Sequence, residues 1–334
     1  MGLCTSLRWL MPAVGLIAFS AQAELDRTLF QKILPSVVRV HAYTKNGVAS
    51  GSGVVVAPGK LISNCHVTRD AKAIDVIAWN SKWKVKEQIK DIDHDLCLLI
   101  LHSEIGKVAE LADGSDIKIG QRVAAAGYPS GGRLEVTEGQ IRALHNLDGG
   151  RVIQSSAPFE GGESGGGLFD NQGRLIGIIA FRGAHFFALP TVWIKKLLET
   201  ETTDFSATKQ NVAFWERAPN DQPNFLQADV REASQDWAGL KAQAERWTQE
   251  ETTNPESWIA LGKSLYHLHR QPDAIPALRK AAELDPQNSL GWLYLAQAYR
   301  DIKDAKAFAE AMENLAALDP AAAQALLAEG PITK

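Results

Sequence analysis

The sequence is poor in cysteine and has no concentration of positive charge. Only three of its 334 residues are cysteine, and the formal net charge is −4. Lysine and arginine form no run that could follow a phosphate backbone, so we do not expect nucleic acid as a partner. Histidine, cysteine and acidic residues do not occur at metal-ligand spacings, and we therefore expect no metal and no cofactor.

The sequence also lacks an apolar run of about 20 residues, the length that a membrane-spanning helix needs. The N-terminal apolar stretch covers only residues 9–18, and the small residues Ala-Gln-Ala follow at 21–23, a pattern typical of a secretory cleavage site. We expect residues 1–23 to be a signal peptide, which predicts an exported protein, periplasmic or secreted, with no stable membrane span. The mature chain then keeps Cys65 and Cys97 in a compartment where disulfides persist.

The chain divides into two parts with different periodicity. A length of 334 residues exceeds one ordinary domain. Residues 24–200 contain short segments typical of β-strands, separated by glycine and polar turns, which predicts an all-β barrel or sandwich. The expected strands are Ser36–Tyr43, Gly53–Ala57, Leu61–Asn64, Ala73–Trp79, Leu96–Leu101, Arg122–Gly127, Gln140–Leu144, Arg151–Gln154, Arg174–Phe181 and Phe186–Leu189. Residues 201–224 are expected to be a linker, since they are polar and end in the turn-rich Arg217–Asn224 segment.

Residues 225–334 have helical periodicity and an internal repeat. The tripeptide Leu284-Asp285-Pro286 returns 34 residues later as Leu318-Asp319-Pro320, and apolar positions recur with the same period. This pattern resembles the tetratricopeptide repeat, a helix-turn-helix unit. Helices expected at Asp236–Trp247 and Ala321–Ala328 would cover the ends of the stack. We expect the repeats to form their own core and to offer a surface for a protein partner.

Five glycines surround Ser164 in the segment GGESGGGLFD, residues 161–170. A common phosphate-binding loop ends in Gly-Lys-Ser or Gly-Lys-Thr, and this segment has no lysine. The pattern Gly-x-Ser-x-Gly also marks the nucleophile of α/β-hydrolases, in which a helix follows the serine and the acid and histidine come later in the chain. Here the sequence after Ser164 instead predicts two strands joined by a turn at Asp170–Gly173.

His66 and Asp95 supply the alternative order of histidine, aspartate and serine. His66 comes directly after an apolar strand, and Asp95 precedes the strongly apolar run Leu96–Leu101. Asp91 and Asp93 compete with Asp95, but neither adjoins that run. In such a set the histidine takes the serine proton, and the aspartate orients the imidazole and stabilises its charged form.

These segments resemble the trypsin-like serine proteases of the HtrA/Deg family. The resemblance covers residues 26–198 and is carried, in the family's order, by LPSVVRVHA, GSGVVVAPGKLISNCHV, HDLCLLIL, IKIGQRVAAAGYPSG, IQSSAPFEGGESGGGLFD, LIGIIAF and FFALPTVWI. It implies two packed six-stranded β-barrels with the active site between them. The expected fold is therefore multidomain, an all-β chymotrypsin-like double barrel followed by an all-α tetratricopeptide-repeat domain in place of the family's PDZ domain.

The resemblance and the residue chemistry assign the same roles. Ser164 would be the nucleophile, His66 the base and Asp95 the orienting acid, with the backbone N–H groups of Gly162 and Ser164 forming the oxyanion hole. The expected function is that of an exported serine endopeptidase whose repeats recruit polypeptides. Glu163 stands where HtrA proteases usually have asparagine, which leaves open a second hypothesis, a protease-fold scaffold with little activity that binds a partner through its repeats.

Two further positions bear on cleavage specificity. Pro158 occupies the place where trypsin has an aspartate that selects basic side chains, and Phe186 falls where HtrA proteases tend to have glycine. The resemblance therefore implies a short primary specificity pocket for small or medium aliphatic side chains.

The two remaining cysteines lie beside the predicted catalytic residues. Cys65 precedes His66, and Cys97 lies two residues after Asp95. Contact between His66 and Asp95 would bring the two cysteines close enough for a disulfide, which we favour over two small buried apolar side chains.

Overall fold

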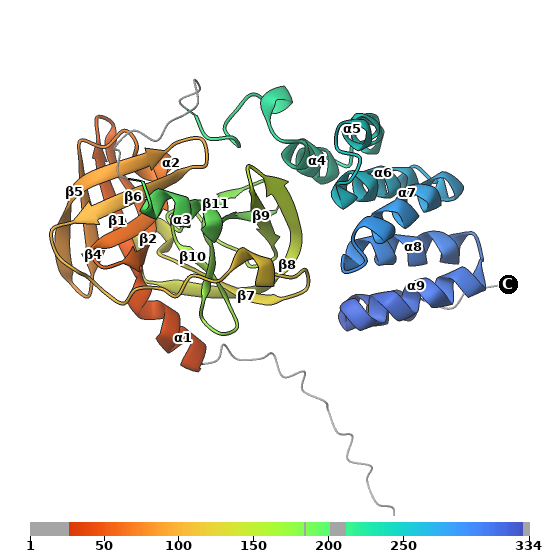
Figure 1. Ribbon diagram of the computed structural model, residues 1–334, viewed down its shortest axis with the longest axis horizontal. Coiled ribbons are helices and arrows are strands. Elements are labelled where there is room, and N and C mark those ends of the chain that lie inside the picture. The colour runs from red at the N-terminus through yellow and green to blue at the C-terminus, as the bar shows by residue number, and fades with distance from the viewer. Residues whose placement is uncertain (1–26, 184, 201–211, 330–334) are drawn as a thin grey trace, which may run out of the picture.

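The computed structural model describes residues 27–183, 185–200 and 212–329. A β domain lies beside a stack of helices (Figure 1). The strands close into two six-stranded antiparallel barrels, which confirms the predicted double barrel. The expected signal peptide, residues 1–23, lies outside the described ranges. None of the helices within these ranges is long and apolar enough to cross a membrane.

The first barrel has the strand order β1-β2-β3-β6-β5-β4. Its strands are β1 (Val37–Thr44), β2 (Gly47–Ala57), β3 (Lys60–Asn64), β4 (Ala73–Ala78), β5 (Ser81–Asp91) and β6 (Leu96–Leu101). Alternating apolar side chains such as Val40, Val76 and Leu99 fill its interior and are fully buried. β3 pairs with β6 so that Asn64 lies opposite Leu96. This register places the end of β3 next to the start of β6.

The second barrel has the order β10-β11-β12-β9-β8-β7. Its strands are β7 (Arg122–Gly127), β8 (Glu135–Leu147), β9 (Gly150–Ser155), β10 (Gly167–Asp170), β11 (Leu175–Arg182) and β12 (Phe186–Pro190). Two short helices flank the barrels, α1 (Arg27–Ile33) before the first and α3 (Thr191–Leu198) after the second. The fully buried Trp193 and Leu197 of α3 pack in the main apolar cluster of the molecule.

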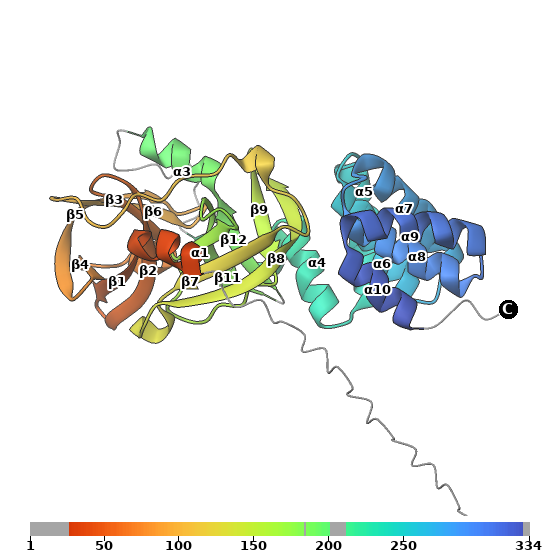
Figure 2. The same ribbon diagram turned by 90° about the horizontal axis from the view of Figure 1, so that it is seen from below.

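The C-terminal part is entirely helical. Its helices are α4 (Asn224–Ala233), α5 (Trp237–Glu250), α6 (Pro255–His267), α7 (Gln271–Leu284), α8 (Ser289–Asp301), α9 (Ala305–Leu318) and α10 (Pro320–Ala328). They stack one beside the next, as Figure 2 shows from below. An Asn or Asp side chain caps the N-terminus of most of them, as Asn254 does for α6 and Asn288 for α8.

The 34-residue period of the sequence reappears as repeated contacts. The indole N–H of Trp258 donates to the carbonyl of Thr252 at 3.0 Å, and that of Trp292 donates to the carbonyl of Pro286 at 2.9 Å. Gly262 lies where α6 and α7 approach each other, because a Cβ there would come within 2.4 Å of Leu278. These contacts agree with the predicted tetratricopeptide repeat.

Two histidines of the β domain contact the first helices. Nδ1 of His145 in β8 lies 2.6 Å from Oε2 of Glu256 in α6, and its ring stacks on Phe225 of α4. His185 pairs with Asp229 of α4. Burial opposes protonation of His145, but the charge of Glu256 and the hydrogen bonds to Glu256 and Gln154 together outweigh it and raise the pKa of the imidazole. The contribution of this pair to stability is therefore present in acid and is lost as the pH rises through the raised pKa.

The repeats are less independent of the β domain than the sequence predicts. Helices α6–α10 share an apolar cluster that includes Leu278 and Leu315, as expected of a stack with its own core. However, Phe225 and Trp247 belong to the same cluster as Phe187 of the second barrel. The first helices and the second barrel thus bury each other's apolar surface.

Candidate active site

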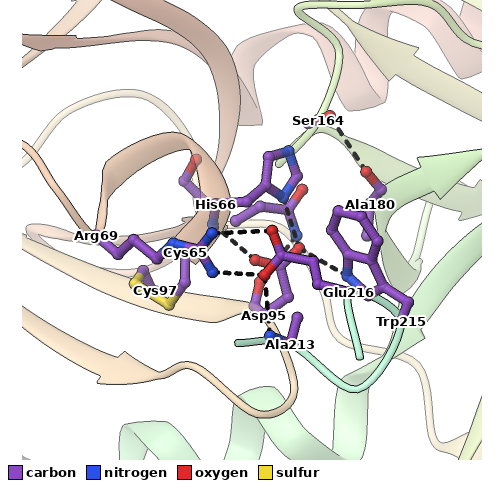
Figure 3. Close-up of polar contacts among 12 residues, drawn as sticks. Cys65, His66, Arg69, Asp95, Cys97, Ser164, Ala180, Ala213, Trp215 and Glu216 are labelled. Carbon is purple, nitrogen blue, oxygen red and sulfur yellow. Dashed lines mark hydrogen bonds and ion pairs between the residues drawn. A yellow bond between two sulfur atoms is a disulfide. The ribbon is translucent and has the colours of Figure 1, made fainter. Parts of the chain in front are cut away.

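His66 and Asp95 lie in direct contact at the edge of the first barrel. His66 sits in α2 (Cys65–Thr68), the short helix after β3, and Asp95 immediately precedes β6. Oδ2 of Asp95 lies 2.7 Å from Nδ1 of His66, and Oδ1 accepts the His66 backbone N–H at 2.7 Å (Figure 3). The competing carboxylates have other partners, since Asp91 binds His94 and Asp93 binds Arg217.

The backbone at Asp95 is held in an unusual conformation. Its φ is 57°, in the left-handed region that residues other than glycine adopt rarely, and its side chain is fully buried. The side-chain amide of Asn64 donates to the Asp95 carbonyl at 2.9 Å, and the backbone N–H of Cys65 donates to the same carbonyl at 3.2 Å. The pairing of β3 with β6 and these two hydrogen bonds thus hold Asp95 next to Asn64 and Cys65, the residues that precede His66.

Ser164 comes from the second barrel, just before β10. The first barrel holds its backbone, because the N–H of Ser52 in β2 donates to the Ser164 carbonyl at 2.8 Å. The Ser164 hydroxyl donates to the carbonyl of Ala180 in β11 at 3.2 Å, as Figure 3 shows. Among the described residues, this is the hydrogen bond that the hydroxyl makes, so in this structure it is directed toward Ala180 rather than His66.

Two backbone N–H groups of the loop at Ser164 have no backbone acceptor within the described ranges. The carbonyl of Gly161 accepts from Ser130 N–H at 2.7 Å, and the carbonyl of Glu163 accepts from Gly166 N–H at 2.8 Å. In a trans peptide the N–H points opposite to the carbonyl, so the N–H groups of Gly162 and Ser164 point away from these partners. Neither N–H donates to another backbone carbonyl within the described ranges. Both are therefore free to bind an anion.

Gly162 is required by the geometry of this loop. Its φ is 98°, and a Cβ there would come within 2.4 Å of the Ser130 nitrogen. Gly161, to which the sequence analysis gave the same purpose, has an ordinary φ and open space at its Cβ position. Of these two residues, only Gly162 therefore has to be glycine.

Glu163 is buried beneath this loop with one oxygen lacking a partner. Its side chain accepts the backbone N–H of Glu160 at 2.6 Å through Oε2, while Oε1 has no hydrogen-bond partner among the described residues. Only 2% of the residue is exposed. Burial, and then the neighbouring charges of Glu135 and Glu160, raise the pKa of the Glu163 carboxyl.

The raised pKa of Glu163 gives a stability prediction. A carboxyl whose folded-state pKa is raised favours folding when protonated and opposes it once ionised, so its penalty is absent below its unfolded-state pKa and complete above the raised one. We expect Glu163→Gln to increase the free energy of unfolding at neutral pH and to leave it nearly unchanged in acid. Urea unfolding at several pH values measures this difference. Glu110→Gln, an exposed change in the same domain, is the control. A Glu163→Gln effect that does not depend on pH would contradict the assignment.

A segment that the sequence analysis places in the linker reaches the His66–Asp95 pair. The indole N–H of Trp215 donates to Oδ2 of Asp95 at 3.3 Å, and the Trp215 ring meets the His66 ring edge-on at 5.4 Å. Glu216 binds the guanidinium of Arg69 through both oxygens, at 2.5 and 2.9 Å. Sequence reasoning missed these residues, although the apolar cluster VAFW at 212–215 stands out in a polar stretch.

The sulfur atoms of Cys65 and Cys97 form a disulfide in this structure, with Cα atoms 4.9 Å apart. Cys65 opens α2 and Cys97 lies in β6, so the bridge joins the two elements that carry His66 and Asp95. Both cysteines are fully buried.

We predict that this disulfide forms in the exported protein. Denatured, unreduced mature protein should then react with no alkylating reagent, and reduction should release two thiols. The bridge spans 32 residues, so replacing both cysteines with alanine should lower the free energy of unfolding by roughly 3–4 kcal/mol. Two thiols that react before reduction would show that the bridge is absent.

A group of potential metal ligands beside this site already has polar partners. Asp93, His94 and Asp148 bring ligand atoms within 4.8 Å of one another. However, Nδ1 of His94 lies 2.7 Å from Asp91, Nε2 lies 3.2 Å from Asp148, and Asp93 binds Arg217. We assign no metal chemistry to this group, and the absence of a metal from the protein stays a prediction.

Comparison with known proteins finds a family match in each part of the chain. The trypsin-like peptidase domain family matches residues 51–178, and a tetratricopeptide repeat family matches residues 255–298. A probable periplasmic serine endoprotease, DegP-like, from Pseudomonas fluorescens is 37% identical over 134 residues, or 38% of this chain and 28% of the relative. The serine protease HTRA4 of Mus musculus is 30% identical over 192 residues, or 51% of this chain and 39% of the relative.

Solved structures of similar proteins include the serine endoprotease from Yersinia pestis, with 28% identity, a TM-score of 0.47, and coverage of 51% of this chain and 64% of that one. The HtrA-type protease AlgW with tripeptide has 26% identity, the same TM-score, and coverage of 51% and 61%. The matched regions span between 24% and 39% of the first curated relatives.

The β domain thus combines the double barrel with a match to the trypsin-like peptidase domain family over residues 51–178. It is related to the HtrA-type serine proteases, and tetratricopeptide repeats follow it, as the sequence resemblance predicts.

Proposed function

We propose that the protein is an exported serine endopeptidase that hydrolyses peptide bonds through Ser164, His66 and Asp95. The observation that carries this proposal is the buried contact between Oδ2 of Asp95 and Nδ1 of His66, at 2.7 Å, beside a loop whose free N–H groups flank Ser164. A histidine oriented in this way can act as a base for a serine, and the N–H groups can bind the oxyanion that forms.

The chemistry proceeds in two halves. Asp95 occupies Nδ1 of His66, which leaves Nε2 to accept the proton of the Ser164 hydroxyl as Oγ attacks the substrate carbonyl. The N–H groups of Gly162 and Ser164 stabilise the negative oxygen. The peptide C–N bond then breaks, His66 returns the proton to the leaving amine, and an acyl-enzyme remains on Ser164. A water molecule, deprotonated by His66, hydrolyses this ester and restores the serine.

The Ser164 hydroxyl must turn from Ala180 toward His66 before it can react. This bond to Ala180, together with the buried Glu163 under the oxyanion loop, favours a second candidate function, a protease-fold scaffold with little activity. Hydrogen bonds between catalytic groups are often absent in unliganded enzymes and form when the substrate binds. We therefore place the peptidase first.

The substrate and partner classes follow from the two domains. A trypsin-like peptidase domain acts on polypeptides, and tetratricopeptide repeats are protein-binding units, so we propose that the repeats recruit or orient the polypeptide or bind a partner protein. Phe186 packs against Phe159 with ring centroids 5.2 Å apart, which supports a short specificity pocket for small or medium aliphatic side chains. Export to the periplasm or beyond is part of the proposal, and the Pseudomonas relative is a probable periplasmic protein.

The proposal predicts a specific dependence on pH. His66 must be neutral to accept the serine proton, and histidines change charge between about pH 5 and 8. Hydrolysis of a short chromogenic peptide with alanine or valine before the cleaved bond should therefore be minimal in acid and rise through this range to a plateau. The measurement is kcat/KM against pH. A rate that falls across the same range, with the fold intact by circular dichroism, would contradict the role of His66.

A further inference from the structure

We propose that residues 213–217, the catalytic strap, position the His66–Asp95 pair, and that Trp215 is the positioning residue through which the strap acts. This inference rests on the proposed peptidase function and goes beyond it, because the strap follows the β domain in the sequence and leads directly into the helical part. It assigns a role to the interdomain connection at the reaction centre itself.

The strap binds the loop that carries Asp95 at three points. The backbone N–H of Phe214 donates to the Asp93 carbonyl at 2.9 Å, and Arg217 pairs with the Asp93 carboxylate. Between these anchors, the indole of Trp215 donates to Oδ2 of Asp95 at 3.3 Å. The same oxygen faces Nδ1 of His66, so it receives two N–H groups from different directions. Two donors fix the plane of a carboxylate more firmly than one.

The strap also binds the helix that carries His66. Glu216 forms a two-point ion pair with Arg69, which comes three residues after His66, and also accepts the backbone N–H of Ala213 at 3.0 Å. Burial opposes ionisation of Glu216, but the Arg69 guanidinium and the Ala213 N–H together outweigh it and lower the pKa of the carboxyl. The strap therefore contacts both the end of the helix that carries His66 and the loop that carries Asp95.

Aromatic packing fixes the position of Trp215. Its ring stacks on Phe181 at 5.1 Å with an interplanar angle of 15°, and the neighbouring Phe214 is 1% exposed and meets Phe181 edge-on. Phe181 belongs to β11. The residue before it in the same strand, Ala180, accepts the hydrogen bond of the Ser164 hydroxyl through its carbonyl. The Trp215 indole thus lies between the first-barrel pair and the second-barrel strand beside Ser164.

The other end of the strap is bonded to the first helix of the repeat part. The side-chain amide of Gln222 donates to the carbonyls of Trp215 and Arg217 at 2.7 and 3.2 Å. Gln227 of α4 donates in turn to the Gln222 carbonyl at 2.8 Å. A displacement of α4 would therefore reach Trp215 through two hydrogen-bonded steps. This is a physical route by which binding to the repeats could alter the geometry of the His66–Asp95 pair.

The test compares Trp215→Phe with Trp258→Phe in the full-length mature protein. Phenylalanine keeps an aromatic ring at position 215 but removes the indole N–H and part of the ring volume, and Trp258→Phe makes the same change at an indole hydrogen bond in the repeats. Because hydrogen bonds to charged groups are among the stronger ones, we expect Trp215→Phe to lower kcat by about 10-fold with little change in KM. Trp258→Phe should leave both constants unchanged.

A second readout does not depend on activity. In the wild-type protein, the His66 Nδ1 proton shared with Asp95 should give a downfield proton NMR signal, assigned by its loss in His66→Gln. Trp215→Phe should shift or broaden this signal, and Trp258→Phe should not. In an Asp95→Asn background, Trp215→Phe should have little further effect on kcat, because the group through which it acts is gone.

The outcomes separate the inference from the function on which it rests. If the wild type hydrolyses peptides and Trp215→Phe changes neither kcat nor the histidine signal, the strap has no positioning role and the inference is overturned. If the wild type hydrolyses nothing, the proposed peptidase function fails, and the histidine signal alone decides whether Trp215 positions the pair. An equal decrease of kcat in Trp215→Phe and Trp258→Phe would indicate a general loss of stability and would also overturn the inference.

Discussion

Replacing Ser164 with alanine should lower the kcat of peptide hydrolysis by about four to six orders of magnitude. The hydroxyl is the group that forms the acyl-enzyme, and without it only the oxyanion site and substrate binding remain to accelerate attack by water. The fold should persist, because the hydroxyl makes a single hydrogen bond to Ala180 among the described residues. The measurement is turnover of a short chromogenic peptide by proteins purified free of host proteases.

The matched control for this change is Ser103→Ala, which removes an exposed hydroxyl in the same domain and should keep full activity. Retention of more than about a tenth of wild-type kcat by the Ser164→Ala protein would contradict the assignment of the nucleophile. Loss of activity in both variants would point to handling or folding rather than chemistry.

Replacing Asp95 with asparagine should lower kcat by about 10⁴-fold while leaving the fold intact. The two carboxylate oxygens of Asp95 face three N–H groups, two from His66 and one from Trp215, and an amide can offer its single oxygen to only part of this set. With its NH₂ group turned toward Nδ1, asparagine would favour the imidazole tautomer that carries its proton on Nε2, which cannot accept a proton from serine.

The control for this second change is Asp70→Asn. Asp70 lies just after the helix that carries His66, and its side chain is 82% exposed. It should alter kcat by less than about twofold, as expected for an exposed charge. If Asp95→Asn also kept near-normal kcat, the contact between Asp95 and His66 would be structural only.

Much of the fold could be predicted because its elements are defined by local periodicity. The two barrels and the repeat helices appear where the sequence analysis places them, and β10 (Gly167–Asp170) is the strand expected before the turn at Asp170–Gly173, but β5 (Ser81–Asp91) was not among the expected strands. The alternation of lysines with Trp83 and Val85 in β5 has the period of a strand, but Glu87 and Gln88 interrupt it and the two apolar side chains are only partly buried.

The candidate site could be predicted only in part. Chain order and the apolar strand after Asp95 single it out from Asp91 and Asp93, and the structure brings it into contact with His66. Ser164 lies in the other barrel, and its hydroxyl is bonded to Ala180. The catalytic roles of these residues stay predictions.

The catalytic strap was beyond the reach of sequence patterns. Trp215 lies 120 residues from Asp95 along the chain. Its segment lacks the periodicity of a helix or strand, and a polar, proline-containing stretch of this kind is typical of a linker. The contact depends on the tertiary packing of Phe214 and Trp215 against Phe181, which only the folded chain reveals.

Labelling with a fluorophosphonate tests the central claim most directly, because this reagent forms a covalent adduct only with a serine activated as a nucleophile. The account predicts one phosphonylated residue per mature chain, located at Ser164 by peptide mass spectrometry, with no labelling of the Ser164→Ala protein and strongly slowed labelling of Asp95→Asn. A folded wild-type protein that takes up no reagent across pH 6–9, or that is labelled equally after Ser164→Ala, would contradict the account and favour the scaffold.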